Sequence, residues 1–297
     1  MFIADTVYLD STGAALYPQI LLDNFYKDLS SHVYGNPHSR SSSSQQSTDA
    51  IEQVRNRILA LFNTTQEQYS IIFTSGATSA LQIIADNFDW KSSSMANDND
   101  AHNDQSCFCF LEENHTSVVG IREVAASHGA HICCVNSKNI AAIQEKSNNL
   151  KHLISNTKND VVIEKSSGPA DTFTLNLFAY PAMCNFSGRK YQLEWISAIK
   201  DGTLFPCQKH CCGANWFVLL DAASFVSSSR LDLNLYPADF IPLSFYKIFG
   251  FPTGLGALLV KNTSGSILKK SYYGGGTVLA TITSDTFHLL KPAISER

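Results

Sequence analysis

The sequence predicts an α/β fold in which a sheet of parallel strands is covered by helices on both faces. Two observations carry this prediction. Short segments that are apolar throughout, such as Cys107–Leu111 and Trp216–Leu220, have the composition of strands buried on both sides. These segments alternate with stretches whose apolar residues recur at helical spacing, such as Thr78–Phe88.

The N-terminal part of the chain is expected to be mainly helical. A short strand at Val7–Leu9 is followed by a helix over Pro18–Leu29, which has apolar residues at helical spacing. A turn-rich loop at 34–38 comes next, since Gly, Asn and Pro interrupt regular structure. A longer helix is predicted over Thr48–Phe62, with Ser47 or Thr48 as its N-cap.

From residue 66 onward the pattern of strand, loop and helix repeats. The predicted strands are Ser70–Phe73, Cys107–Leu111, Ile132–Val135, Leu175–Tyr180, Trp216–Leu220, Phe240–Ser244 and Ala257–Val260. The predicted helices are Thr78–Phe88, Ser117–Ser127, Ala141–Ile154 and Leu193–Ile199.

Two polar insertions interrupt this pattern. Residues 91–106 are rich in Ser, Asn and Asp and are predicted to be disordered, and residues 158–171 are predicted to form a loop. The expected organisation is therefore an N-terminal arm with helices (1–65), a large domain (66–280) and a truncated or divergent tail (281–297).

Composition argues against several kinds of partner. The 297 residues are 44% hydrophobic and 16% charged, and a net charge of -4 without a basic face gives no reason to expect nucleic acid. No apolar stretch approaches the about 20 residues that cross a bilayer. The first residues also lack the features of a signal peptide. We expect a cytoplasmic protein without a membrane partner.

Eight cysteines are expected to be reduced thiols. The cluster Cys207, His210, Cys211 and Cys212 has the side chains that zinc prefers, but it has no Cys-x-x-Cys pair. A cysteine-rich surface loop is therefore predicted there, and no metal site. The other cysteines lie in apolar segments and are predicted to be small core residues.

The residues that follow each strand are the candidates for ligand binding, because ligands of open parallel sheets bind beyond the carboxyl ends of the strands. Thr74–Ser79 combines small residues with the start of a helix, where backbone N–H groups and the helix dipole attract an anion. An ordinary helix cap is the alternative. The segment is not a Walker loop, since it has no Gly-Lys-Ser/Thr element.

Three polar side chains follow other predicted strands. His115 can stack on an aromatic ligand or transfer a proton, although a lone loop histidine is more often solvated. Asn185 can donate to a ligand oxygen or belong to an ordinary turn. Asp221 ends a buried strand, where a carboxylate needs a cation or good donors. A protonated pyridine nitrogen is such a cation, and a cap or a structural ion pair is the alternative.

Lys247 lies within the segment 245–251, which also contains four aromatic residues. Desolvation by such neighbours favours the neutral amine that a Schiff-base lysine requires. The nearby Gly254 and Gly256 let the backbone turn sharply or approach another group closely. An anion site, a stacking ring, an amide, a carboxylate and a desolvated lysine together match the needs of pyridoxal 5'-phosphate.

Seven segments resemble the class V aminotransferase-fold enzymes, and within them the N-terminal, cysteine-desulfurase-like domain of molybdenum cofactor sulfurases. They are Tyr8–Asp10, Val33–Ser39, Ile72–Thr78, Asn185–Gly188, Leu220–Ala223, Ser244–Gly254 and Tyr273–Thr277. The resemblance covers nearly the whole chain except the polar insertions. It implies the large domain of a fold-type I transferase that depends on pyridoxal phosphate, with a mostly parallel seven-stranded sheet and helices on both faces.

The resemblance also implies a role for each candidate residue. Lys247 would form the Schiff base and move the α-proton of the substrate. The implied phosphate contacts are Ala77, Thr78 and Ser244, and the implied ring contacts are His115 by stacking, Asn185 at the ring hydroxyl and Asp221 at the ring nitrogen.

The activity implied by the resemblance is sulfur transfer from L-cysteine to the molybdenum cofactor. A homodimer is implied as well, with the Asn36-Pro37 loop and residues 274–277 facing the partner. Tyr246 and Ser224 stand where general cysteine desulfurases have His and Gln, which favours the sulfurases. Ser11 stands where the sulfurase pattern has His.

The match fades after Thr277. We therefore expect a truncated small domain, without the persulfide-forming cysteine, the arginine for the substrate carboxylate and the C-terminal domain for the molybdenum cofactor. Two alternatives stay open. One is a general cysteine desulfurase or a selenocysteine lyase of class V, and the other is a non-catalytic fragment that binds pyridoxal phosphate.

Overall fold

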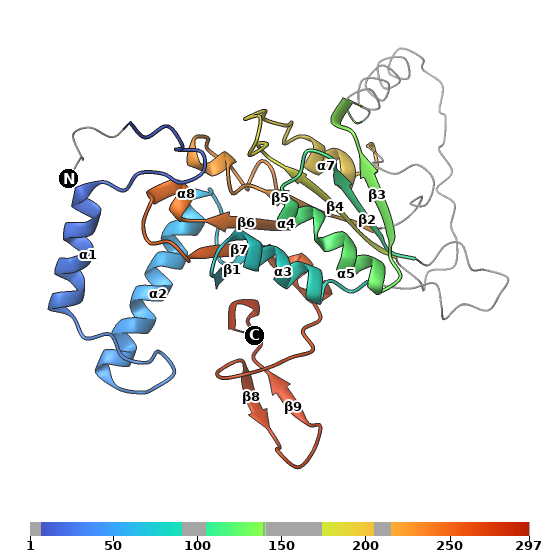
Figure 1. Ribbon diagram of the computed structural model, residues 1–297. Coiled ribbons are helices and arrows are strands. Elements are labelled where there is room, and N and C mark those ends of the chain that lie inside the picture. The colour runs from blue at the N-terminus through green and yellow to red at the C-terminus, as the bar shows by residue number, and fades with distance from the viewer. Residues whose placement is uncertain (1–6, 91–104, 139, 141–173, 205–214, 297) are drawn as a thin grey trace, which may run out of the picture. The chain divides into compact units, whose positions relative to one another are not determined.

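The computed structural model describes residues 7–90, 105–138, 140, 174–204 and 215–296. The chain divides into two compact units, one formed within residues 1–87 and 222–297 and the other within residues 88–221. Their strands follow one another in a seven-stranded sheet of order β1-β7-β6-β5-β4-β2-β3 (Figure 1). The predicted division at residues 65 and 280 is not tested and stays a prediction.

The first unit contains three strands of this sheet and, among the described residues, four α-helices. Its helices are α1 (Gln19–Ser31), α2 (Ser42–Leu61), α3 (Ala77–Asn87) and α8 (Tyr246–Phe249), with 3₁₀ turns η2 (Phe225–Ser227), η3 (Asn262–Ile267) and η4 (Ile294–Glu296). Its strands are β1 (Tyr69–Thr74), β6 (Phe240–Ser244) and β7 (Gly256–Lys261), with a separate hairpin of β8 (Val278–Thr281) and β9 (His288–Leu290). β7 lies between β1 and β6 and is antiparallel to both.

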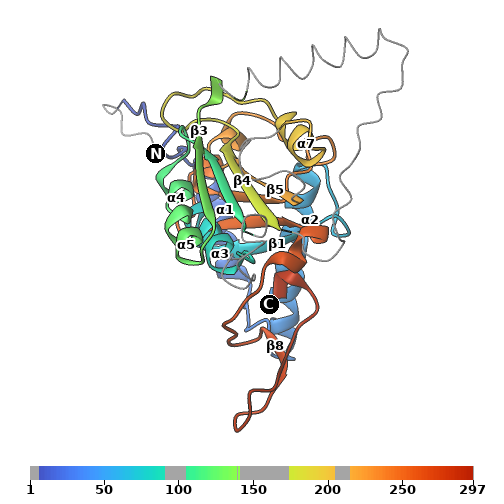
Figure 2. The same ribbon diagram turned by 90° about the vertical axis from the view of Figure 1, so that its right-hand side faces the viewer.

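The second unit contains the other four strands. They are β2 (Cys107–Leu111), β3 (His131–Val135), β4 (Leu175–Pro181) and β5 (Asn215–Asp221). β3 pairs with β2, β2 with β4 and β4 with β5, each in parallel. The helices are α4 (Thr116–Val119), α5 (Ile121–Ser127) and α7 (Trp195–Lys200). Figure 2 shows α4 and α5 on one side of these strands and α7 on the other. The predicted mostly parallel sheet with helices is confirmed.

The strand predicted at Val7–Leu9 is wrong. These residues have no regular structure, and the side chains of Val7 and Leu9 are exposed. The chain turns directly afterwards, because the carbonyl of Asp10 accepts hydrogen bonds from the amides of Gly13 and Ala14. The helix predicted over Pro18–Leu29 is present as α1, but none of its residues is buried.

Two other predictions differ from the structure or lie beyond it. The helix predicted over Ser117–Ser127 is divided into α4 and α5 at Gly120. The β8–β9 hairpin was not predicted. The helix predicted at 141–154, the loop at 158–171 and the cluster Cys207–Cys212 lie outside the described residues, as does most of the insertion 91–106.

α2 begins six residues earlier than the sequence predicts. Its N-cap is Ser41, whose hydroxyl accepts the amide of Ser44 at 3.2 Å. The predicted caps are wrong because both residues lie inside α2 and their hydroxyls donate to carbonyls: Ser47 Oγ to Gly35 O of the preceding loop at 2.7 Å, and Thr48 Oγ1 to Ser44 O of the helix at 3.1 Å. The start of α2 was not predicted because its serine-rich first turns contain no apolar residues at helical spacing.

Replacing Ser41 with alanine is expected to lower the free energy of unfolding by about 1 kcal/mol, because an N-terminal amide of α2 loses its acceptor. Urea denaturation followed by circular dichroism measures the change. Ser42→Ala is the matched control, since Ser42 is exposed and lies one residue further along the same turn. Equal losses in both variants would contradict capping by Ser41.

In the part of the chain that the structure describes, every helix is too short or too polar to span a bilayer.

Candidate functional site

The predicted anion site lies at the start of α3, in the first unit. β1 ends at Thr74, and Gly76 has a φ of 154°, which turns the chain into α3. The amide of Ala77, the first residue of α3, donates to Ser244 Oγ at 2.9 Å. Ser244 ends β6 and is buried. The structure therefore brings together Ala77 and Ser244, which are far apart in the sequence.

This contact adds a hydroxyl donor to the predicted anion site. Ser244 Oγ accepts a hydrogen bond from the amide of Ala77, so the Ser244 hydroxyl can still donate a hydrogen bond to another acceptor. An anion at this end of α3 would thus meet a serine hydroxyl as well as backbone amides, with Thr78 as the second residue of the helix.

Gly256 makes the meeting of β1 and β6 sterically feasible. It pairs with Thr74 on one side and with Ser244 on the other. A Cβ atom at Gly256 would lie 2.4 Å from the carbonyl oxygen of Leu243 and 2.5 Å from the Cα of Gly76. The close approach that the sequence predicts for this glycine is confirmed.

Lys247 lies in α8, three residues after Ser244, and its side chain is half-buried. Its Nζ donates to Ser224 Oγ at 3.2 Å. Ser224 is only 4% exposed and directly precedes η2. In the sequence, Ser224 is visible only as a departure from the desulfurase pattern, because its contact with the lysine depends on the fold.

The sequence predicts that the aromatic residues near Lys247 desolvate its amine. In the structure, not all of these residues lie around the amine. Phe249 is 47% exposed. Phe251 packs edge-on against Phe25 of α1, with ring centroids 5.1 Å apart, and against Tyr17. These rings hold the N-terminal segment near α8, where the amide of Ala15 also donates to the carbonyl of Tyr246 at 3.2 Å.

The second unit holds the other three candidates at the carboxyl ends of neighbouring parallel strands. Asp221 is the last residue of β5 and is 9% exposed. Asn185 is exposed in a loop after β4, closed by a hydrogen bond from the amide of Gly188 to the carbonyl of Cys184 at 2.9 Å. His115 follows β2. Because β5, β4 and β2 are consecutive and parallel, all three lie along one edge of this unit.

His115 is the N-cap of α4. Its Nδ1 accepts the amide of Ser117 at 3.2 Å, so the neutral ring carries its proton on Nε2. The preceding Asn114 ties this loop to the sheet, since its Nδ2 donates to the carbonyls of Leu111 at 2.9 Å and Ala179 at 3.0 Å. Asn114 was not predicted from the sequence, because only the contact with β4 distinguishes it from an ordinary loop residue.

The cysteines follow the core prediction only in part. Cys107, Cys109 and Cys184 are buried, whereas Cys133 is half-buried and Cys134 is exposed because β3 is the edge strand. Burial raises the pKa of the Cys184 thiol, but hydrogen bonds from Ser187 and Phe186 outweigh burial, and the pKa is lowered. Among the described residues, no three histidine, cysteine or acidic side chains cluster as metal ligands.

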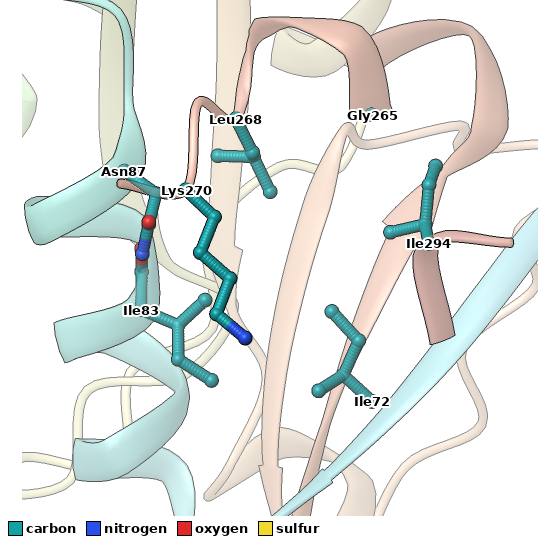
Figure 3. A pocket seen from close by; sticks show the side chains of 7 residues that line it. All are labelled: Ile72, Ile83, Asn87, Gly265, Leu268, Lys270 and Ile294. Carbon is teal, nitrogen blue, oxygen red and sulfur yellow. The ribbon is translucent and has the colours of Figure 1, made fainter. Parts of the chain in front are cut away.

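A separate cavity of about 170 Å³ lies in the first unit. It is lined by Ile72, Ile83, Asn87, Gly265, Leu268, Lys270 and Ile294 (Figure 3). Ile83 and Asn87 belong to the last turns of α3, whereas the anion site is at the first turn. The cavity contains none of the predicted site residues.

Solved structures show which fold this is. The chain superimposes on the cysteine desulfurase CsdA of Escherichia coli with a TM-score of 0.65 and 20% identity, covering 96% of this chain and 61% of that one. It superimposes on a C-DES variant described as having glycine covalently linked to the PLP cofactor with a TM-score of 0.67 and 18% identity, covering 99% and 66%. The fold is that of the fold-type I transferases.

The family is shown by the sequence. The model of the family "Aminotransferase class-V" matches residues 7–167 and 200–291. The chain belongs to the class-V aminotransferase family. Its relatives include the molybdenum cofactor sulfurases of Danio rerio (46% identical over 99% of the chain), Homo sapiens (43% over 99%) and Arabidopsis thaliana (39% over 98%). The chain covers 33%, 30% and 35% of these proteins, so it spans about a third of their length.

Proposed function

We propose that this chain binds pyridoxal 5'-phosphate and serves the transfer of sulfur from L-cysteine to the molybdenum cofactor. The observation that carries the proposal is the pair of contacts in the first unit, Lys247 with Ser224 and Ala77 with Ser244. One contact positions an amine, and the other builds an anion site three residues away along the chain. The identity of 39–46% to molybdenum cofactor sulfurases supports the choice of reaction.

The residues of the first unit fit this cofactor chemically. Bound pyridoxal phosphate supplies an aldehyde for a lysine amine and a ring that withdraws electrons from the α-carbon of an amino acid. Lys247 would hold the aldehyde carbon and then move the α-proton at its Nζ. The first amides of α3, at Ala77 and Thr78, and the Ser244 hydroxyl would bind the phosphate.

The residues of the second unit are proposed to act on the ring. The carboxylate of Asp221 would hold a proton on the ring nitrogen, which stabilises the charge that develops there. The exposed ring of His115 would stack on the cofactor, and the side-chain amide of Asn185 would donate to the ring hydroxyl. Each side chain lies at the carboxyl end of a parallel strand, where ligands of such sheets bind.

A cytoplasmic location and a homodimer belong to the same proposal. The described cysteines are free thiols, as expected in a reducing compartment. Within α1, Ile20 is 62% exposed and Tyr26 is 77% exposed, and exposed apolar side chains of this size commonly cover a partner surface.

The proposed function is tested by titrating the protein with pyridoxal phosphate and with pyridoxal, each followed by its visible absorbance. Pyridoxal phosphate is expected to bind at one site per chain, and pyridoxal about tenfold more weakly or worse, because it leaves the charged hydrogen bonds at α3 unmade. L-cysteine is then added together with a small thiol, which accepts the sulfur as a persulfide in place of the persulfide-forming cysteine that is expected to be absent, and alanine is measured. Equal binding of both compounds would exclude the anion site, and bound cofactor without alanine would favour a non-catalytic role.

A further inference from the structure

We propose that Ser224 is a positioning residue for Lys247, holding the lysine amine in the direction from which it meets an aldehyde. The inference rests on the proposed function and deepens it. It assigns to Ser224 a role in the reactivity of the lysine rather than in binding the cofactor.

The geometry of the pair supports this role. The Nζ of Lys247 and the Oγ of Ser224 are 3.2 Å apart. Ser224 is 4% exposed, so packing restricts the directions in which its hydroxyl can point. The side chain of Ser224 makes no capping bond to η2, although the residue occupies the N-cap position of that turn.

Both partners stand on backbone that is held by its own hydrogen bonds. In the turn after Ser224, the hydroxyl of Ser227 donates to the carbonyl of Ser224 at 2.7 Å, and the amide of Val226 donates to the carbonyl of Ala222 at 3.1 Å. α8 is anchored by the amide of Phe245, which donates to the carbonyl of Leu255 at 3.1 Å. The two short helical segments pack against each other.

A serine hydroxyl suits this task chemically. The lysine side chain is a flexible four-carbon stem, and one hydrogen bond at its end removes many alternative positions of the amine. A hydroxyl accepts a hydrogen bond from the ammonium and donates one to the neutral amine, so it can hold the lysine in both protonation states. Alanine can do neither, and threonine can do both.

The test compares pyridoxal phosphate with pyridoxine 5'-phosphate, which has an alcohol in place of the aldehyde. In Ser224→Ala, the covalent adduct at Lys247 is expected to form about tenfold more slowly, because the amine is no longer directed. The dissociation constant of pyridoxine phosphate should stay within about twofold. Ser224→Thr should restore the rate, and the control Ser228→Ala, at an exposed serine directly after η2, should leave it unchanged.

A second measurement needs no cofactor. Formaldehyde with cyanoborohydride methylates lysines at rates that mass spectrometry resolves for each residue. Freed from Ser224, the amine of Lys247 is expected to react about threefold faster in Ser224→Ala, with Lys270 of the same unit as the internal reference. Ser224→Ala is thus expected to slow adduct formation with pyridoxal phosphate and to accelerate methylation of the same lysine. A general loss of structure would not change the two rates in opposite directions.

The possible outcomes separate the two proposals. Adduct and methylation rates that do not change in Ser224→Ala would overturn the positioning role. Equal losses of affinity for pyridoxal phosphate and pyridoxine phosphate would also overturn the positioning role, because the hydroxyl would then act on the cofactor or on the fold. Absence of any adduct at Lys247 in the unaltered chain would instead refute the proposed function, and methylation would still report on the contact between the two side chains.

Discussion

Lys247→Ala is expected to abolish covalent retention of pyridoxal phosphate. The unaltered chain, reduced with borohydride after incubation with the cofactor, should carry it on the peptide that contains Lys247. The variant should carry none, because it lacks the amine that Ser224 positions in the unaltered chain. Mass spectrometry of the digested protein measures the result.

Two controls make this result specific to Lys247. Lys261→Ala, at the end of β7 in the same unit, should retain the adduct fully. The Lys247→Ala protein should also still bind pyridoxine phosphate, since the proposed anion site of Ala77 and Ser244 does not involve the lysine. An adduct of equal yield on another lysine would mean that Lys247 has no special reactivity.

Gly256→Ala is expected to lower the free energy of unfolding by about 3 kcal/mol, a large part of the roughly 5–15 kcal/mol that stabilises a protein. The new Cβ would overlap backbone atoms of Leu243 and Gly76 at 2.4 and 2.5 Å, and backbone in a paired sheet cannot move away cheaply. Moving Gly76 also displaces the amide of Ala77, so binding of pyridoxal phosphate should weaken in the same variant. Urea denaturation and cofactor titration measure the two effects.

Gly120→Ala is the matched control for this prediction. Gly120 has a φ of -61°, and a Cβ there would have its nearest contact at 3.4 Å from the carbonyl of Thr116, an ordinary distance. The exchange should change stability by less than about 1 kcal/mol, because alanine fits the helical backbone better than glycine does. Similar destabilisation in both variants would show that steric overlap at Gly256 is not the cause.

The end of β6 positions both Ser244 and Lys247, the two side chains of the first unit to which we assign a chemical role. Ser244 caps α3, and Lys247 follows after a single turn of chain into α8. A shift of β6 along β7 would therefore displace the proposed anion site and the lysine amine together. The antiparallel register of Ser244 with Gly256 and of Thr74 with Gly256 ties this strand end to the loop before α3.

The sequence alone determined those features of this protein that depend on neighbours in the chain. The strands at Cys107–Leu111 and Phe240–Ser244 were predicted to the residue, because buried strands need apolar side chains throughout. The candidate residues at strand ends were found in the same way. The prediction was wrong where the local pattern was weak, as at the serine-rich start of α2. It was also wrong where an apolar segment forms no strand, as at Val7–Leu9.

Only the tertiary structure decided which of these residues meet. Gly256 and Gly76 approach each other from segments 180 positions apart, and Ser224 reaches Lys247 over 23 positions. The antiparallel direction of β7 and the exposure of Cys134 on edge strand β3 also depend on pairing between distant segments. Composition and periodicity describe how each segment is buried, whereas hydrogen bonds and steric limits between segments settle where a side chain acts.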